Sequence, residues 1–220
     1  MKLLLTSAGI KNESIKQALL ELLDKPIEEC TALCIPTAIY ALNGGTQHAW
    51  NFFNGDFSTP MCELGWKSIG VLELSALPSI DESVWRPAFE RADVLLVNGG
   101  DPLFLHHWMK QSGVAALLPS WEGVYVGLSA GSMVMTPRIG EAFVGWRSSD
   151  EQSDETLGFV DFSIFPHLDH EMLPENTSRD AAEWAETLQA PAYAIDDETA
   201  IRVNEGKVDV ISEGKWKKFF

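Results

Sequence analysis

The residues around Ser129 constrain the fold more than any other part of this 220-residue chain. The apolar run Val124–Leu128, which has the character of a β-strand, leads into the pattern Gly-x-Ser-x-Gly between Gly127 and Gly131. Residues 133–135, Met-Val-Met, are typical of a helix. A strand that passes into a helix through so short a turn needs small residues around the turn, and glycine gives that freedom. The pattern therefore predicts a strand, a sharp turn that exposes a serine, and a helix.

The rest of the chain alternates between short apolar runs and longer amphipathic stretches. This alternation is typical of α/β proteins with a doubly wound, mostly parallel sheet that helices cover on both faces. After the turn at Ser129 the pattern changes, and Asn204-Glu205-Gly206 lies between two alternating runs, which predicts a C-terminal β-hairpin. The predicted strands are residues 3–6, 31–36, 68–74, 93–97, 124–128, 160–165 and 192–195, and the predicted helices are residues 12–23, 46–64, 81–91, 103–111, 114–118 and 177–188.

Length and composition favour one soluble domain over residues 1–220. The chain is 45% hydrophobic, enough for one substantial core, and it has no internal repeat or linker. Its first apolar run is too short for a secretion signal, and no run approaches the ~20 apolar residues of a membrane span. Cys30, Cys34 and Cys62 have no paired CxxC spacing, which fits a reducing compartment. We therefore expect a cytoplasmic protein.

The charge of the chain excludes two classes of partner. Lysine and arginine total 16 against 32 aspartate and glutamate residues, which gives a formal net charge of −16. A surface this acidic repels the phosphates of nucleic acids and anionic lipid headgroups. We therefore expect neither nucleic acid nor membrane as a partner. The eight tryptophans can line a cleft, fill the core or form the face of a homodimer, so a homodimer is compatible with the sequence.

An exposed serine on such a turn is typical of a nucleophile, and a nucleophilic serine needs a base and an acid that orients the base. His167 follows the predicted strand 160–165, which would deliver it to the carboxyl edge of the sheet, so it is the predicted base. Asp196, Asp197 and Glu198 follow the predicted strand 192–195. Asp197 is the predicted acid, with Glu198 as the alternative. The order Ser, His, acid differs from the Ser, acid, His order of α/β-hydrolases, so a different scaffold is indicated.

The segment His167-Leu168-Asp169-His170-Glu171 offers a metal site as an alternative, because it holds two histidines and two carboxylates. Pro166 and Pro174 bracket the segment, and no third ligand stands out elsewhere in the sequence. We therefore predict neither a metal nor a cofactor.

Four motifs together resemble the serine peptidases of the aspartyl dipeptidase (dipeptidase E) and cyanophycinase group. They are Val97-Asn98-Gly99-Gly100-Asp101, Gly127-Leu128-Ser129-Ala130-Gly131-Ser132, Phe165-Pro166-His167 and Ala194-Ile195-Asp196-Asp197-Glu198-Thr199-Ala200. The resemblance spans most of the chain in the family's order. It implies a flavodoxin-like sheet of the class I glutamine amidotransferase type and cleavage of peptide bonds next to an acidic residue.

Carried over to this sequence, the resemblance makes Ser129 the nucleophile, His167 the general base and then acid, and Asp197 the orienting acid. The family often has glutamate in the third place, so Asp197 and Glu198 both stay open. The backbone N–H groups of Gly100 and Ala130 are expected to form the oxyanion hole.

The resemblance also implies a substrate. It is a small acidic peptide, an N-terminal aspartyl dipeptide in the first instance, whose carboxylate an arginine would bind. Among Arg138, Arg147 and Arg179, Arg179 is favoured because Thr177-Ser178-Arg179-Asp180 is similar to a Thr-Arg-Glu segment that follows the histidine in the dipeptidase. Two alternatives stay open: a hydrolase of another amide or ester, and a binding or regulatory module without peptidase activity.

Overall fold

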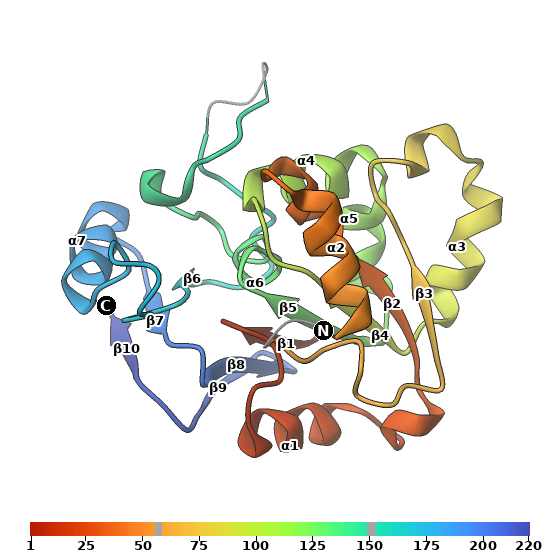
Figure 1. Cartoon of the computed structure of the whole chain (residues 1–220), viewed down its shortest axis with the longest axis horizontal. Coiled ribbons are helices and arrows are strands. Elements are labelled where there is room, and N and C mark those ends of the chain that lie inside the picture. The colour runs from red at the N-terminus through yellow and green to blue at the C-terminus, as the bar shows by residue number, and fades with distance from the viewer. Residues whose placement is uncertain (56–58, 149–152) are drawn as a thin grey trace.

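A mostly parallel sheet forms the centre of the molecule. The computed structural model describes residues 1–55, 59–148 and 153–220, and within these ranges seven strands pair in the order β3-β2-β4-β5-β1-β8-β9 (Figure 1). The strands β1 to β5 are parallel, whereas β8 pairs antiparallel with β1 and β9 pairs antiparallel with β8. Their bounds are β1 Lys2–Thr6, β2 Thr31–Ile35, β3 Ser68–Val71, β4 Val94–Val97, β5 Val124–Leu128, β8 Thr199–Asn204 and β9 Lys207–Ser212. The predicted fold class and C-terminal hairpin are therefore confirmed.

Helices cover both faces of this sheet. Side chains from alternate strand positions pack on one face against α3 (Glu82–Arg91), α4 (Pro102–Gln111), α5 (Val114–Leu117) and residues that begin or follow α6 (Ala130–Met133). The intervening positions pack on the other face against α1 (Glu13–Leu22) and α2 (Gly45–Asn54). Burial from both sides explains why β4 and β5 are apolar at nearly every position.

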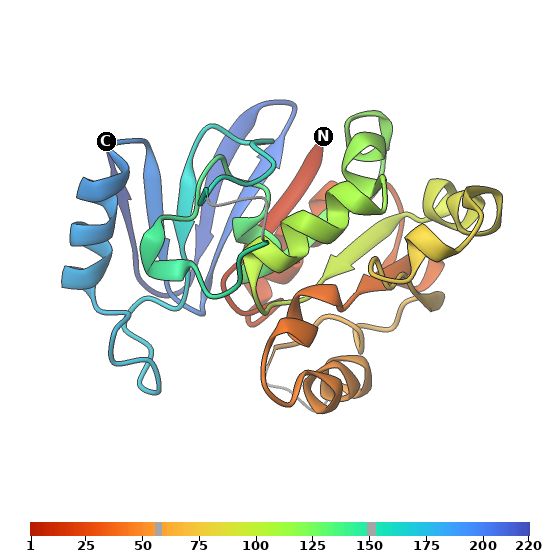
Figure 2. The same ribbon diagram turned by 90° about the horizontal axis from the view of Figure 1, so that it is seen from above.

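A second, smaller sheet was not predicted. It has the order β10-β7-β6, with β6 Ser163–Phe165 parallel to β7 Ala192–Ile195 and β10 Trp216–Phe219 antiparallel to β7. The helix α7 (Ser178–Leu188) packs on it through Trp184 and Leu188. Figure 2 shows β6, β7, β10 and α7 at one end of the molecule and α3 at the other. Of the predicted strand 160–165, only residues 163–165 form a strand. They and the predicted strand 192–195 belong to their own sheet, beside the central one.

The helix predicted over residues 46–64 is shorter in the structure. It ends at Asn54, because Gly55 has a φ of 68° and closes the helix with an N–H bond to the Asn51 carbonyl. Residues 56–58 of the prediction lie outside the described part, and residues 59–64 are irregular. Short 3₁₀ turns occupy Ile27–Glu29, Thr37–Ala41, Leu77–Ser79, Leu118–Ser120 and Glu141–Phe143. Among the described residues, none of the helices has the length and apolar character needed to cross a bilayer.

Candidate active site

Ser129 occupies the sharp turn between β5 and α6. Its backbone has φ 49° and ψ −109°, a strained conformation for a residue with a side chain. The Ser129 N–H donates to the carbonyl of Thr6 at 3.1 Å, and α6 begins at the next residue. The predicted strand, turn and helix are therefore all present, and the turn places the serine at the carboxyl edge of the sheet.

The two glycines of the motif allow this turn because the backbone packs tightly there. A Cβ atom at Gly127 would lie 2.5 Å from the carbonyl oxygen of Gly131, and one at Gly131 would overlap the carbonyl oxygen of Val97. These neighbours are backbone atoms, which cannot rotate away. Glycine is needed at both positions because the first turn of α6 lies directly against β5 and β4.

His167 reaches Ser129 from the second sheet. It follows β6 and adopts a φ of 56°, again in the left-handed region. Its Nε2 lies 3.0 Å from the Ser129 Oγ, which is hydrogen-bond distance between a base and a nucleophile. The two residues are 38 positions apart in the chain.

Asp197 lies in the turn between β7 and β8 and contacts His167, which in turn contacts Ser129. Its Oδ1 lies 2.7 Å from the Nδ1 of His167. Burial by itself would raise the pKa of Asp197, but the hydrogen bond and the charge of His167, with a hydrogen bond from Ser7, outweigh burial and lower the pKa. Asp197 is therefore an anion beside the imidazole at neutral pH.

The two acids on either side of Asp197 have other partners. Asp196 Oδ1 accepts from the hydroxyl of Thr199 at 2.7 Å, and Glu198 Oε2 accepts from the side-chain amide of Asn12 at 3.0 Å. Of the two acids that the sequence left open, Asp197 and not Glu198 is the one in contact with His167.

The turn between β4 and α4 lies against the serine. A Cβ at Gly99 would come within 3.4 Å of the Ser129 Cβ, and Gly100 has a φ of 139°, a conformation open only to glycine. Within the described ranges, neither the Gly100 N–H nor the Ala130 N–H donates a hydrogen bond. These two backbone N–H groups, one in the β4–α4 turn and one next to Ser129 in the chain, therefore have no acceptor in the described part of the protein.

The side chain of Asp101 fixes this turn through hydrogen bonds to three backbone N–H groups. Its carboxylate is buried and accepts from the N–H groups of Leu103 and Phe104, both at 2.9 Å, and of Trp146 at 2.7 Å. Burial raises the pKa of Asp101, and these three backbone donors oppose the rise. One side chain thus caps α4 and fixes the loop around Trp146 to it.

A second histidine contacts the far oxygen of Asp197. His170 Nδ1 accepts from the N–H of Met172 at 3.1 Å, and its Nε2 lies 3.5 Å from Asp197 Oδ2. Both histidines of the segment considered for a metal therefore face the same carboxylate. In the described part of the chain, no three His, Cys, Asp or Glu side chains gather closely enough to hold a metal ion.

Each candidate arginine forms an ion pair with an acid other than Asp197. Arg179 is 80% exposed at the start of α7 and pairs with Asp180 and Glu183 of the same helix, each at 3.6 Å. Arg138 pairs with Asp154 at 2.9 Å and Arg147 with Glu141 at 2.6 Å. The neighbour of Arg179, Ser178, links the start of α7 to the loop of His167, because its N–H donates to Asp169, two residues after His167.

Ser7 was not predicted as a site residue, yet its hydroxyl contacts both His167 and Asp197. Ser7 directly follows β1, which lies beside β5 in the sheet. A polar residue at the carboxyl end of a strand next to the nucleophile's strand was the signal that could have found it.

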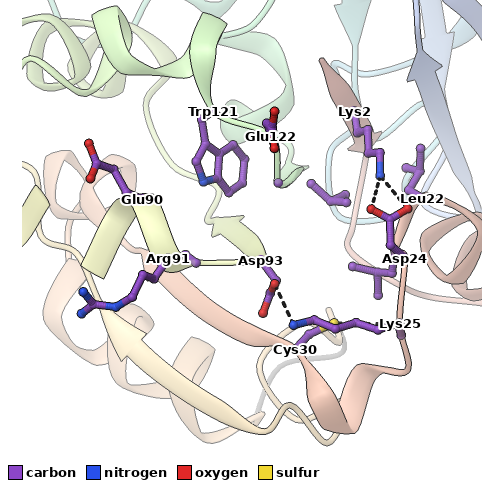
Figure 3. A pocket seen from close by; sticks show the side chains of 14 residues that line it. Lys2, Leu22, Asp24, Lys25, Cys30, Glu90, Arg91, Asp93, Trp121 and Glu122 are labelled. Atoms are coloured by element: carbon purple, nitrogen blue, oxygen red, sulfur yellow. Dashed lines mark hydrogen bonds and ion pairs between the residues drawn. The ribbon is translucent and has the colours of Figure 1, made fainter. Parts of the chain in front are cut away.

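A cavity of about 280 Å³ lies at the opposite edge of the sheet (Figure 3). Lys2 and Val124, which line it, begin β1 and β5, and Asp93 directly precedes β4. Its lysines form ion pairs, Lys2 with Asp24 at 3.0 Å and Lys25 with Asp93 at 2.9 Å. This cavity contains none of the predicted site residues, and its ion pairs join the strand starts to the segment that follows α1.

Comparisons with known proteins agree with this architecture. Residues 3–211 match the model of peptidase family S51. An uncharacterized peptidase of Listeria monocytogenes serovar 1/2a is 28% identical over 124 residues, which cover 53% of this chain and 58% of that protein. The chain thus aligns with little more than half the length of this curated relative.

Two solved structures share the fold. A candidate peptidase E protein from Listeria monocytogenes EGD-e superposes with a TM-score of 0.71 at 19% identity, covering 97% of this chain and 98% of that one. A peptidase from an acI-B1 actinobacterium gives a TM-score of 0.69 at 21% identity, covering 98% and 88%.

Proposed function

This chain belongs to peptidase family S51, which places it among the serine peptidases, and we propose that it is a dipeptidase that hydrolyses N-terminal aspartyl dipeptides through an acyl-enzyme on Ser129. The observation that carries the proposal is the unbroken series of contacts from Ser129 Oγ to His167 Nε2 at 3.0 Å and from His167 Nδ1 to Asp197 Oδ1 at 2.7 Å.

In the first step of the proposed mechanism, Ser129 Oγ attacks the carbonyl carbon of the peptide bond. His167 Nε2 takes the hydroxyl proton as the new C–O bond forms. Asp197 holds the proton on Nδ1, so that Nε2 is free to accept, and stabilises the imidazolium that results.

The negative charge that develops on the substrate oxygen needs fixed donors. We assign this role to the backbone N–H groups of Gly100 and Ala130, which have no acceptor within the described residues. Donors of this kind contribute roughly 2.7–4 kcal/mol each to the lowering of the barrier.

The imidazolium of His167 then gives its proton to the leaving amine as the C–N bond breaks. In the second half, His167 removes a proton from water, the resulting hydroxide attacks the acyl carbon, and the proton returns to Ser129 Oγ. No other proton carrier is required, because His167 is acid and base in turn.

For the acidic side chain of the substrate, we propose Arg179 as the ligand. It is the second residue of α7, whose first residue, Ser178, donates a hydrogen bond to the loop of His167. Its exposed side chain forms ion pairs with acids of its own helix. Exposed pairs of this kind contribute little, so the guanidinium can exchange them for a substrate carboxylate. Arg179→Gln is expected to raise KM for Asp-X dipeptides about tenfold with kcat unchanged, because a charge-assisted hydrogen bond contributes about 1.5–3 kcal/mol. An unchanged KM would remove this assignment.

The test of the function is a panel of Asp-X, Glu-X, Ala-X and isoaspartyl dipeptides, incubated with the protein and with its Ser129→Ala variant. Release of free amino acid from Asp-X by the unmodified protein alone is the expected result. Cleavage of other dipeptides in preference to Asp-X would refute the specificity. If no dipeptide is cleaved while Ser129 still reacts with a fluorophosphonate, the protein hydrolyses another amide or ester.

A further inference from the structure

Ser7 lies where the two sheets meet. It directly follows β1 of the central sheet and is completely buried. Its backbone N–H donates to the carbonyl of Thr199 at 3.3 Å, at the start of β8. The backbone of Ser7 is thus fixed within the central sheet, where β1 lies between β8 and β5, the strand that leads to the turn at Ser129.

The hydroxyl of Ser7 contacts both partners that Ser129 needs. It donates to Asp197 Oδ1 at 3.1 Å and accepts from the backbone N–H of His167 at 2.8 Å. It also lies 3.4 Å from the Nδ1 of His167. Neither partner is close to Ser7 in sequence, because they follow it by 160 and 190 positions.

These contacts act on the two features of the site that most need support. His167 has a left-handed backbone, which costs free energy unless its surroundings hold it, and Ser7 binds the N–H of that residue. Asp197 Oδ1 accepts from His167 and from Ser7 together, so the carboxylate cannot rotate without losing a hydrogen bond. Both His167 and Asp197 follow strands of the small sheet, whereas Ser7 and Ser129 follow strands of the large one.

We propose that Ser7 is a positioning residue. Its hydroxyl holds His167 and Asp197, which follow strands of the small sheet, in a fixed position relative to Ser129, which follows a strand of the large sheet. This inference rests on the proposed function for the roles of the three residues, but not on any particular substrate. Without the hydroxyl, the imidazole would lose its fixed place relative to the Ser129 Oγ, and misplacement of about 1 Å can cost about a hundredfold in rate.

The test compares Ser7→Ala with Ser163→Ala. Ser163 is an equally buried serine whose hydroxyl donates to the Arg138 carbonyl at 2.6 Å and contacts none of the three site residues. Each substitution removes one buried hydroxyl, so effects on stability alone should be alike. The first readout is the rate at which a fluorophosphonate labels Ser129, which needs no knowledge of the peptide substrate. The second is the downfield proton NMR signal of His167 Nδ1–H, assigned by its loss in Asp197→Asn.

Ser7→Ala is expected to slow labelling by about tenfold to a hundredfold, and to shift or broaden the Nδ1–H signal. With a cleaved peptide, kcat should fall while KM stays within about twofold. Ser163→Ala should leave the labelling rate and the signal unchanged, and Ser7→Cys, which keeps a weak donor at the same position, should be intermediate. Equal labelling rates and identical signals in Ser7→Ala and Ser163→Ala would overturn the inference. Absence of dipeptide cleavage, in contrast, would refute only the proposed substrate.

Discussion

Gly127→Ala is the perturbation that most directly tests whether close packing of the serine turn creates the site. The change adds one methyl group to β5, the strand that directly precedes Ser129. Its Cβ would lie 2.5 Å from the Gly131 carbonyl oxygen, against 3.4 Å or more for an ordinary contact, so α6 and β5 must separate by about 0.9 Å. The backbone of Gly127 itself has no positive φ, so this variant introduces a clash without a change of allowed conformation.

A separation of this size is enough to break the contact of Ser129 with His167. The Oγ–Nε2 distance is 3.0 Å, and an added 0.9 Å along that line would exceed hydrogen-bond range. Misplacement of about 1 Å corresponds to about a hundredfold loss of rate. The overpacking itself is expected to cost about 1–3 kcal/mol. For a chain of this size, that lowers Tm by roughly 2–12 °C.

The assay combines thermal unfolding followed by circular dichroism with the rate of fluorophosphonate labelling. Gly206→Ala is the control, because Gly206 has a φ of 80° in the β8–β9 turn and a Cβ there would meet no heavy atom within 4 Å. It should lose roughly 1–2 kcal/mol through backbone strain and label at the normal rate. If Gly127→Ala labels within about twofold of the unmodified protein, the packing argument for the turn is refuted.

Three further predictions concern the carboxylates. Asp197→Asn should lower kcat by about 10⁴-fold, as loss of the orienting anion does in serine proteases. Glu198→Gln should keep kcat within about twofold, because the carboxylate of Glu198 binds Asn12 and not His167. Equal losses of kcat in the two variants would contradict the assignment of Asp197. Asp101→Asn should lower the free energy of unfolding, measured in urea, by about 1–3 kcal/mol, because the carboxylate oxygen that accepts from the Trp146 N–H becomes an NH₂ group. An unchanged midpoint of urea unfolding would show that this hydrogen bond is dispensable. Because the pKa of Asp197 is lower in the folded protein than its ordinary value of 3.8, its contribution to stability is present above pH 3.8 and is lost as the pH falls through the folded pKa. Urea unfolding should therefore show a difference between the protein and Asp197→Asn that shrinks on acidification, and a difference independent of pH would contradict this reasoning.

Local features of the sequence were enough for the serine turn and the parallel sheet. Gly127, Ser129 and Gly131 define the turn by their spacing alone, and the buried strands are continuous apolar runs because helices cover both faces. Features that depend on long-range pairing were not predictable in the same way. The strand Trp216–Phe219 contains Lys217 and Lys218, so its sequence did not indicate a strand. It forms by pairing with β7, which precedes it in the chain.

The third member of the site illustrates the same limit. Asp196, Asp197 and Glu198 are adjacent and chemically similar, so the sequence could not separate Asp197 from Glu198. The contact of Glu198 with Asn12, a residue 186 positions away, distinguishes them. Ser7 went unnoticed because a lone serine has no pattern of its own, and its partners lie in the last quarter of the chain.

The most direct test of the central claim is intact-mass analysis after incubation with a fluorophosphonate, followed by peptide mapping. We expect one covalent adduct per chain, located on Ser129, absent from Ser129→Ala and formed far more slowly in His167→Ala. An adduct that forms at the same rate in Ser129→Ala, or its absence from the unmodified protein, would contradict a serine nucleophile activated by His167.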